Sequence, residues 1–368
     1  MNALRPIPFA LGCLAGVLVQ IQTLEAADSR QEGSARGGAT RIQSQTRKST
    51  PSKSYPTFGS VDRRDPGLDA LLAPDARMEK LAEGFTWSEG PVWRSASADL
   101  LFSDVPKNRI HRWSETDGLS VFLEPSGYTG RALQFREPGS NGLATDRAGN
   151  LLVCQHGDRR IARLRSDGTF EPLAEFVNGR RLNSPNDLCV AANGDIYFTD
   201  PPYGHEGLDA SPLKELLFNG VYLRRRNGEL VLLTDQIPFP NGIALSPDGR
   251  TLYVNQSDPR SPVITAFPVK PDGTVGDGST FFDTSPLMPG RKGLPDGLKV
   301  DERGNLWSSG PGGILVISPT GKLLGLLDTG VPTANCNWGD DGRTLYITAD
   351  TQLLRIRTLV RGACWERR

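Results

Sequence analysis

The sequence of 368 residues lacks several features that would each indicate a different class of protein. It has no net charge, because 42 Lys and Arg balance 42 Asp and Glu, whereas a nucleic-acid binder usually concentrates basic residues on one face. Only 37% of the residues are hydrophobic, too few for a protein with several membrane spans. No G-x-S-x-G, H-E-x-x-H or Walker-type motif is present, so acyl-serine, zincin and P-loop chemistries lose support.

Cysteine is also scarce, with five residues in the whole chain. Cys13 falls in the N-terminal apolar segment, and Cys154 and Cys189 lie within apolar stretches where we expect small buried side chains. Cys336 and Cys364 complete the set. We therefore expect no dense disulfide framework, and the sequence leaves any pairing open.

The first 26 residues have the pattern of a secretory signal peptide. A positive residue precedes an apolar run from about Ile7 to Ile21, and Ala26 and Ala27 offer a cleavage point. A single membrane anchor is the alternative, but the run is short and contains a proline and two glycines. We expect export to the periplasm or the medium, with no stable membrane span after cleavage.

Residues 27–75 are rich in Ser, Thr, Arg, Gln, Gly and Pro and show almost no apolar periodicity. Such a stretch cannot bury enough apolar surface to offset its ordering entropy, so we predict a disordered linker. A single domain at 76–357 and a C-terminal tail at 358–368 complete the predicted organisation.

Glycine and proline are plentiful, with 41 and 28 residues, which predicts a turn-rich chain of short strands. Within 76–357 one pattern recurs six times: alternating apolar positions, a turn with Gly or Asp, and an apolar-aromatic strand. Its equivalent positions lie 39–56 residues apart, at Leu101, Leu151, Ile196, Leu252, Leu306 and Leu345. These intervals predict an all-β fold, a six-bladed β-propeller, rather than a β-sandwich with coincidental hairpins.

The last of the six copies lacks a fourth strand, while a similar segment, MEKLAEGF at 78–85, is left over near the start. We expect this N-terminal strand to complete the last blade. The ring would then close without an open sheet edge.

A polar residue stands at the same position in each predicted first strand. The first strand of a blade lines the central channel, so equivalent positions of all blades converge on one axis. Apolar residues follow at alternate positions, which makes the polar residue the exception in its strand. All six have a side-chain oxygen: Glu89, Asn141, Asn186, Asn241, Asp296 and Asn335.

Oxygen donors gathered in a protein interior need a partner, and two of these six are carboxylates whose uncompensated burial is costly. A divalent cation satisfies carboxylates and amide oxygens together, and hard oxygen ligands favour Ca²⁺, Mg²⁺ or Mn²⁺ over structural zinc. The alternative is structural, because Asn or Asp before Gly is common in turns. Turn preference does not explain Glu89, however, which takes the position that other copies fill with Asn.

Six stretches carry a family resemblance: EGPVW, LNSPND, YFTDPPYG, PNGIALSPDGRTLYV, LPDGLKVDERGNLW and NWGDDGRTLYIT. Through them, over about residues 76–357, the chain resembles the gluconolactonase and regucalcin family of six-bladed propellers, also called SMP-30/gluconolactonase-like. The resemblance implies one divalent metal ion at the channel mouth and hydrolysis of a small-molecule sugar lactone. We expect Ca²⁺, with Mg²⁺, Mn²⁺, Fe²⁺ and Zn²⁺ as alternatives, in a monomer or dimer.

The resemblance also implies roles for residues that match the family's motifs. The metal-binding Glu of the EGP motif, Asn of the PNG motif and Asp of the PDG motif fall on Glu89, Asn241 and Asp296. The Asn of the ND motif, a ligand in some members and a substrate contact in others, falls on Asn186. The Asp of PDG is also the proposed acid/base, so Asp296 is the catalytic candidate. An Arg shortly before ND contacts substrate in some relatives; the arginines here lie slightly farther away, and Arg181 is the candidate.

Two further residues are candidate substrate contacts. His156 ends a predicted strand at CQHG, where it can act as a proton shuttle, contact substrate or serve a structural role. Tyr203 follows the DPP turn and is expected in a pocket wall.

The expected reaction is opening of a lactone ring by water. The metal would polarise the carbonyl, while Asp296 would take a proton from water or pass one to the departing ring oxygen. Two alternatives stay open on the same scaffold: hydrolysis of organophosphates or aryl esters, and a non-enzymatic ligand-binding propeller.

Overall fold

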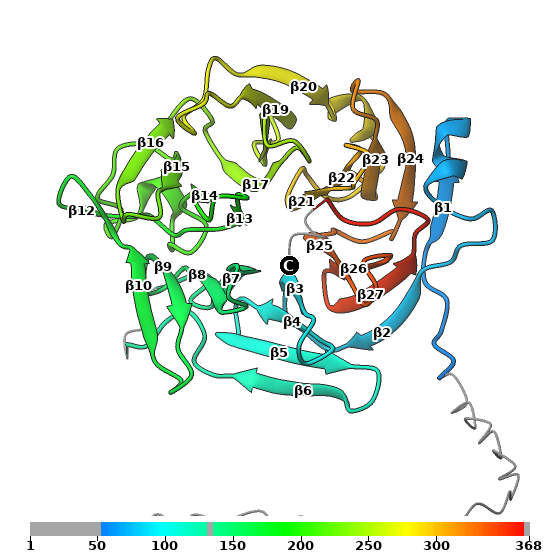
Figure 1. Ribbon diagram of the computed structural model, residues 1–368, viewed down its shortest axis with the longest axis horizontal. Helices are drawn as coiled ribbons and strands as arrows, with labels where there is room; N and C mark the ends of the chain where they lie inside the picture. The colour runs from blue at the N-terminus through cyan, green and yellow to red at the C-terminus, as the bar shows by residue number, and fades with distance from the viewer. Residues whose placement is uncertain (1–52, 131–134, 364–368) are drawn as a thin grey trace, which may run out of the picture. The chain divides into compact units, whose positions relative to one another are not determined.

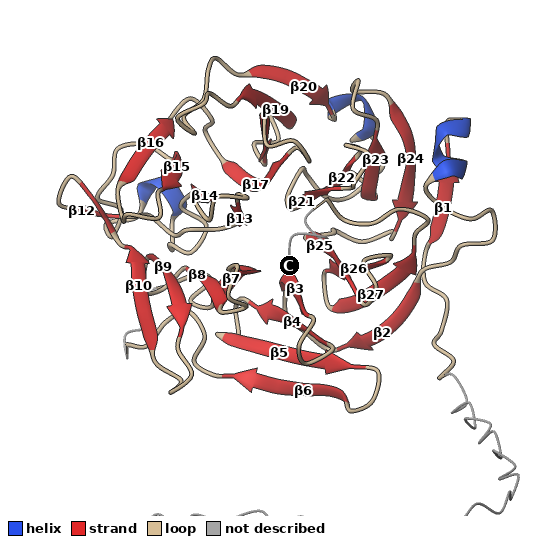
Figure 2. Cartoon of the chain, in the orientation of Figure 1, coloured by secondary structure: helices blue, strands red, loops and turns tan. Residues whose placement is uncertain are grey.

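A computed structural model describes residues 53–130 and 135–363. Six antiparallel sheets are arranged around a central channel, and the chain visits them in order around the ring (Figure 1). Nearly all regular structure is β-strand, apart from three short 3₁₀ turns, η1 (Pro66–Ala70), η2 (Leu208–Ala210) and η3 (Ser285–Leu287) (Figure 2). The predicted six-bladed β-propeller is confirmed.

The first three blades each contain four strands joined in chain order. Blade 1 comprises β3 (Ser88–Arg94), β4 (Asp99–Asp104), β5 (Arg109–Ser114) and β6 (Gly118–Leu123). Blade 2 comprises β7 (Ser140–Thr145), β8 (Leu151–Gln155), β9 (Arg160–Leu164) and β10 (Phe170–Ala174). Blade 3 comprises β13 (Leu188–Val190), β14 (Ile196–Asp200), β15 (Gly220–Arg224) and β16 (Leu230–Thr234), after a small hairpin of β11 (Phe176–Val177) and β12 (Arg180–Arg181).

The last three blades follow the same order, with additions from the N-terminal part of the chain. Blade 4 comprises β17 (Pro240–Leu245), β18 (Thr251–Gln256), β19 (Val263–Pro268) and β20 (Ser279–Asp283). Blade 5 comprises β21 (Leu298–Val300), β22 (Leu306–Gly310), β23 (Gly313–Ile317) and β24 (Leu323–Asp328), with β1 (Ser60–Arg63) outside β24. Blade 6 comprises β25 (Asn335–Gly339), β26 (Thr344–Ala349), β27 (Gln352–Arg357) and β2 (Glu79–Glu83).

The ring closes through the N-terminal strand, as the missing fourth strand predicts. β2 pairs antiparallel with β27, with Glu79 opposite Arg355 and Glu83 opposite Gln352. The side chains reinforce this pairing, because Arg355 Nε donates to a Glu79 carboxylate oxygen at 2.7 Å. Strands from the two ends of the propeller therefore share one sheet, and the closing edge is paired rather than open.

The predicted disordered linker at 27–75 is wrong at its C-terminal end. β1 pairs with β24 along four residues, from Ser60 opposite Asp328 to Arg63 opposite Gly325. η1 then begins at Pro66, capped by the Asp65 carboxylate, which accepts the Gly67 N–H at 2.8 Å. Leucines of this turn enter the core, which supplies the apolar burial that composition alone did not indicate.

The predicted tail also begins too early, because residues 358–363 belong to the folded domain. Val360 is fully buried, and the Leu359 N–H donates to the Leu71 carbonyl at 2.8 Å. The remaining part of the tail, most of the linker and the predicted signal peptide lie outside the described residues. Over the part of the chain that the structure describes, no helix is both long and apolar enough to cross a membrane.

Glycines let the first strands of neighbouring blades come close together around the channel. The Gly142 N–H donates to the Asn186 carbonyl at 2.7 Å, and the Gly242 N–H donates to the Asp296 carbonyl at 2.9 Å. A Cβ atom on Gly242 would lie 2.2 Å from that Asp296 oxygen, so no larger residue fits without moving the backbone. The Asn-Gly pairs thus serve contact between blades as well as side-chain chemistry.

Candidate active site

A cavity of about 620 Å³ lies at one end of the channel, where the first strands begin. Five of the six predicted oxygen donors line it, each from a different blade: Glu89, Asn141, Asn186, Asn241 and Asp296. The predicted substrate contact Tyr203 lines it too. The structure therefore brings together all four predicted metal ligands, the predicted catalytic residue and one aromatic wall residue.

Glu89 and Asp296 are the two predicted carboxylate ligands that line this cavity, and they lie close enough for the charge of Glu89 to act on Asp296. Glu89 is 1% exposed, and one of its oxygens accepts the Gly90 N–H at 2.6 Å. Burial, followed by the charge of Asp187, raises the pKa of Glu89 above its ordinary value. Burial and the charge of Glu89 raise the pKa of Asp296 further. In the absence of a cation, one proton shared by the pair satisfies both groups.

Polar contacts fix the amide and backbone groups around this pair. Asn241 Nδ2 donates to Ser257 Oγ at 2.9 Å, which leaves its Oδ1 available on the other side of the amide. The Asp296 N–H donates to Ser309 Oγ at 2.9 Å and so holds the residue at the start of β21. Asp296 Oδ1 and Asn141 Oδ1 are buried, and neither has a hydrogen-bond partner among the described residues. Both oxygens could therefore accept a hydrogen bond from a ligand or bind a cation.

The sixth predicted donor, Asn335, does not line the cavity. Its side chain lies deeper in the channel, where Nδ2 donates to Glu89 Oε2 at 3.2 Å. Its Oδ1 accepts the Cys336 N–H at 2.9 Å, so the amide oxygen already has a partner. The ring of equivalent positions therefore contributes five oxygen-bearing side chains to the cavity, and the sixth, Asn335, contacts the Glu89 carboxylate from deeper in the channel.

Two predicted substrate contacts lie away from the cavity. His156 is fully buried behind the cavity wall, with Nδ1 3.9 Å from an oxygen of Glu137. Burial and the neighbouring His205 lower the pKa of His156 to about 3, which keeps its ring neutral at physiological pH. Arg181 lies in the β11–β12 hairpin, where its guanidinium donates to the Asp158 carbonyl and stacks over Phe176. Neither side chain lines the 620 Å³ cavity.

The sequence did not identify an ion pair at the rim of the cavity. Arg136 and Glu137 both line it, with a guanidinium nitrogen 3.1 Å from a carboxylate oxygen. They come from the connection between β6 and β7, which occupies no equivalent position in the repeat. Two further lining residues, the aromatic Trp87 and the aliphatic Leu294, also come from connecting segments. The repeat identifies equivalent positions on the strands, but the connecting loops have no equivalent positions and could not be identified in this way.

Tyr203 forms part of the wall beside the oxygen donors. Its hydroxyl donates to the Phe239 carbonyl at 3.3 Å, and its ring stacks on that of Phe239 at a centroid distance of 6.2 Å. Burial raises the pKa of the Tyr203 hydroxyl, so this group stays protonated and acts as a hydrogen-bond donor.

Comparison with known proteins agrees with this geometry. Residues 87–351 match the family described as SMP-30/Gluconolactonase/LRE-like region. The chain belongs to this family. The span covers every first strand of the propeller, and it confirms the resemblance that the motifs predict.

Individual members of the SMP-30/gluconolactonase family are similar over most of the chain. A gluconolactonase of Zymomonas mobilis is 41% identical over 315 residues, which cover 83% of this chain and 88% of the relative. A 6-deoxy-6-sulfogluconolactonase of Pseudomonas putida is 29% identical over 270 residues, covering 72% and 83%. A solved gluconolactonase structure from Xanthomonas campestris is 35% identical and superposes with a TM-score of 0.73, covering 84% of this chain and 99% of that one.

Proposed function

We propose that the protein is a hydrolase that opens sugar lactones with the help of one divalent cation bound by Glu89, Asn186, Asn241 and Asp296. The similarity to lactonases supports the reaction, since the gluconolactonase relative is 41% identical over most of both chains. The observation that carries the proposal is the convergence of these four side chains on one cavity of about 620 Å³.

The charges around the channel fit a divalent ion. Three carboxylates lie close together there: Glu89 and Asp187 both contact Asn335 Nδ2, and the charges of both raise the pKa of Asp296. Lys299 pairs with Asp187, Arg136 pairs with Glu137 at the rim, and Arg291, which also lines the cavity, lies 4.0 Å from a carboxylate oxygen of Asp62. Two negative charges therefore stay uncompensated at Glu89 and Asp296, which equals the charge of one divalent cation.

The types of oxygen atom in the cavity also fit a divalent cation. The buried Oδ1 of Asp296 has no hydrogen-bond partner among the described residues, and Asn241 has its nitrogen bound to Ser257 with its oxygen left over. Over the same residues no group of three or more His, Cys, Asp or Glu is placed to hold a metal, so a cation held here would take amide oxygens as well as carboxylates. An all-oxygen set of carboxylates and amides favours Ca²⁺, with Mg²⁺ and Mn²⁺ next.

The bound cation would supply a positive charge that polarises the lactone carbonyl. The chain supplies the remaining chemistry. Asp296, through the carboxylate oxygen that the cation would leave free, accepts a proton from the attacking water and returns it to the departing ring oxygen. Tyr203, whose hydroxyl donates to the Phe239 carbonyl, forms part of the wall, and Trp87 and Leu294 give the cavity an apolar side that limits water around the sugar ring.

The proposal is tested with chelator-treated protein and one substrate from each class. Hydrolysis of D-glucono-1,5-lactone is expected to fall to the uncatalysed rate after chelation and to recover on addition of Ca²⁺. An aryl ester and a phosphotriester serve as competing substrates, measured under the same conditions. Full lactonase activity in the chelated protein would contradict the cation, and a preference for the ester or phosphotriester would contradict the substrate class.

Export and a monomeric or dimeric state remain part of the proposal. The predicted signal peptide lies outside the described residues. Mass spectrometry of the secreted or periplasmic protein would locate its first residue, and sedimentation would give its oligomeric state.

A further inference from the structure

We propose that Asn335 is a positioning residue that holds the Glu89 carboxylate in the orientation needed to bind the cation, and that Lys299 and Asp187 hold Asn335 in turn. The inference rests on the cation site proposed above. The sixth blade would then contribute to the site through Asn335, although this residue does not line the cavity.

The contacts of the Asn335 amide are directional. Nδ2 donates to Glu89 Oε2 at 3.2 Å and approaches Asp187 Oδ2 at 3.5 Å. Oδ1 accepts from the Cys336 N–H at 2.9 Å and from Lys299 Nζ at 3.4 Å. Because a backbone N–H and an ammonium group both require an acceptor, the oxygen must face them and the NH₂ group must face the carboxylates.

A glycine makes room for this amide. A Cβ atom on Gly297 would lie 2.0 Å from Asn335 Cγ and 2.4 Å from its Nδ2. The amide is therefore in close contact with the backbone that directly follows Asp296. Asn335 thus reaches Glu89 by hydrogen bond and the segment after Asp296 by contact, which links both proposed carboxylate ligands to one side chain.

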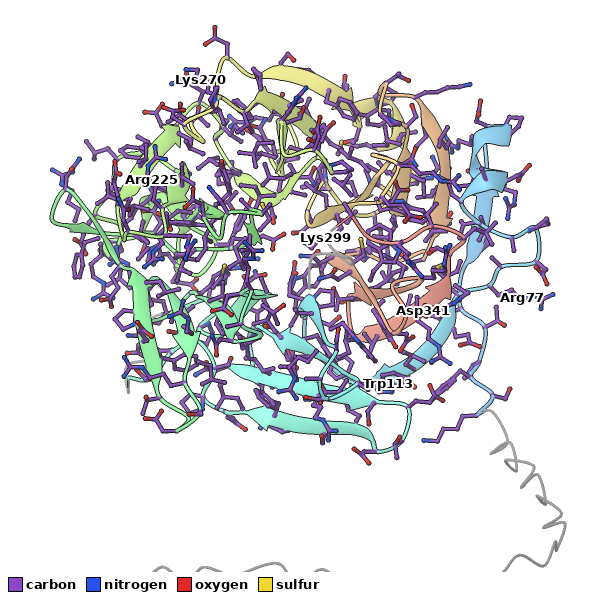
Figure 3. All side chains as sticks on the ribbon, viewed as in Figure 1. Arg77, Trp113, Arg225, Lys270, Lys299 and Asp341 are labelled. Carbon is purple, nitrogen blue, oxygen red and sulfur yellow. The ribbon has the colours of Figure 1, made fainter. Side chains whose placement is uncertain are left out.

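Lys299 lies on β21 near the middle of the ring (Figure 3). Its ammonium group donates to the Leu298 carbonyl at 3.0 Å and to Asp187 Oδ2 and Asn335 Oδ1, each at 3.4 Å. Three donors thus meet three acceptors of the chain, so Lys299 needs no ligand of its own. Its charge compensates Asp187, which leaves the two charges of Glu89 and Asp296 for the cation.

Residues that orient a metal ligand usually affect metal affinity strongly, about 10- to 100-fold when removed. Asn335→Leu keeps a side chain of similar volume but removes the donor to Glu89. We expect its dissociation constant for Ca²⁺ to rise by about 10- to 100-fold, measured by calorimetric titration of the chelator-treated full-length protein. Asn335→Ser, whose short hydroxyl cannot reach Glu89, is expected to give the same loss and serves if the leucine variant does not fold.

Asn337 provides the matched control, because it is the same residue type on the same strand, two positions further along. Its Nδ2 donates to the Pro91 carbonyl at 2.8 Å, and it lines a separate cavity of about 550 Å³ formed by the later residues of the first strands. Asn337→Leu is expected to keep the wild-type affinity for Ca²⁺. Comparing the free energies of unfolding of the calcium-free variants separates a loss of affinity from a general loss of stability.

The possible results distinguish this inference from the proposed function. If wild-type protein binds no Ca²⁺, Mg²⁺ or Mn²⁺, the proposed cation site is wrong, and the role of Asn335 is wrong as well. If wild-type protein binds the ion and both Asn335 variants bind it equally well, the cation site stands and the positioning role is wrong. An equal loss in Asn337→Leu would likewise overturn the role assigned to Asn335.

Discussion

Lys299 and Asp187 form an ion pair inside the channel, with 3.4 Å between the ammonium nitrogen and a carboxylate oxygen. The Asp187 side chain is only 2% exposed, so its charge has little contact with solvent. Replacing Lys299 by Met leaves that charge buried without its cation, and the free energy of unfolding is expected to fall by about 3 kcal/mol.

The double variant Asp187→Asn/Lys299→Met tests the reason for this loss. It removes both charges together, so it is expected to recover most of the stability that the single variant loses. Urea unfolding at pH 7 measures all three proteins. A double variant as unstable as Lys299→Met would show that lost packing of the lysine side chain, and not charge, accounts for the effect.

Asp296 is expected to carry the proton transfer in catalysis. Asp296→Asn keeps an oxygen at the same place but cannot accept the proton of water, so kcat for D-glucono-1,5-lactone should drop by about 10²- to 10⁴-fold. Steady-state kinetics with saturating Ca²⁺ checks this value. His156→Gln is the comparison, since His156 lies outside the cavity wall and should affect kcat much less. Wild-type kcat in Asp296→Asn would remove the assignment.

The segment that sequence composition assigned to a linker is expected to stabilise the propeller. Leu68, in η1, is fully buried and packs in one cluster with Leu324 and Trp307 of blade 5. Leu68→Ala should lower the free energy of unfolding by about 2–5 kcal/mol. Leu217→Ala, at a side chain that is 91% exposed, is the control and should be near neutral. Equal stability of both variants would mean that η1 adds nothing to the fold.

The sequence predicted the blades well because each blade repeats the same physical requirements. Alternating apolar positions, a turn and a buried strand recur in phase, so six weak local signals support one another. The closing strand β2 was predicted because the repeat has an obvious gap. No such regularity marks β1, which adds to the outer edge of blade 5. The buried leucines of this segment, Leu68, Leu71 and Leu72, follow β1 in a polar stretch.

The candidate site was predictable only where it follows the repeat. Equivalent first-strand positions gave Glu89, Asn186, Asn241 and Asp296, which the structure brings to one cavity. Loops have no equivalent positions, so Arg136 and Glu137 were missed. The repeat also could not show that Asn335 turns to Glu89, because this depends on the space above Gly297 and on Lys299 from another blade.

Asp200 gives the protein a pH dependence of stability that can be separated from catalysis. Its carboxyl group is buried at the end of β14, where Oδ2 accepts the Asn183 N–H at 2.8 Å and Oδ1 has no hydrogen-bond partner among the described residues. Burial raises its pKa to about 7, against an ordinary value of 3.8, despite the opposing effects of the Asn183 N–H and of Arg159.

Because the pKa is higher in the folded state, the fold favours the protonated acid. Its contribution to stability is complete below about pH 4 and is lost as the pH rises through 7, a full change of about 4 kcal/mol. Asp200→Asn keeps an acceptor for the Asn183 N–H and cannot ionise, so it should not show this loss. Urea unfolding at pH 4.5 and pH 8 should therefore show wild-type protein losing stability relative to the variant, with the exposed Asp75→Asn as control for the change in net charge. Parallel curves for wild type and Asp200→Asn would mean that the carboxyl group reaches solvent in the folded protein and titrates there as it does in the unfolded chain.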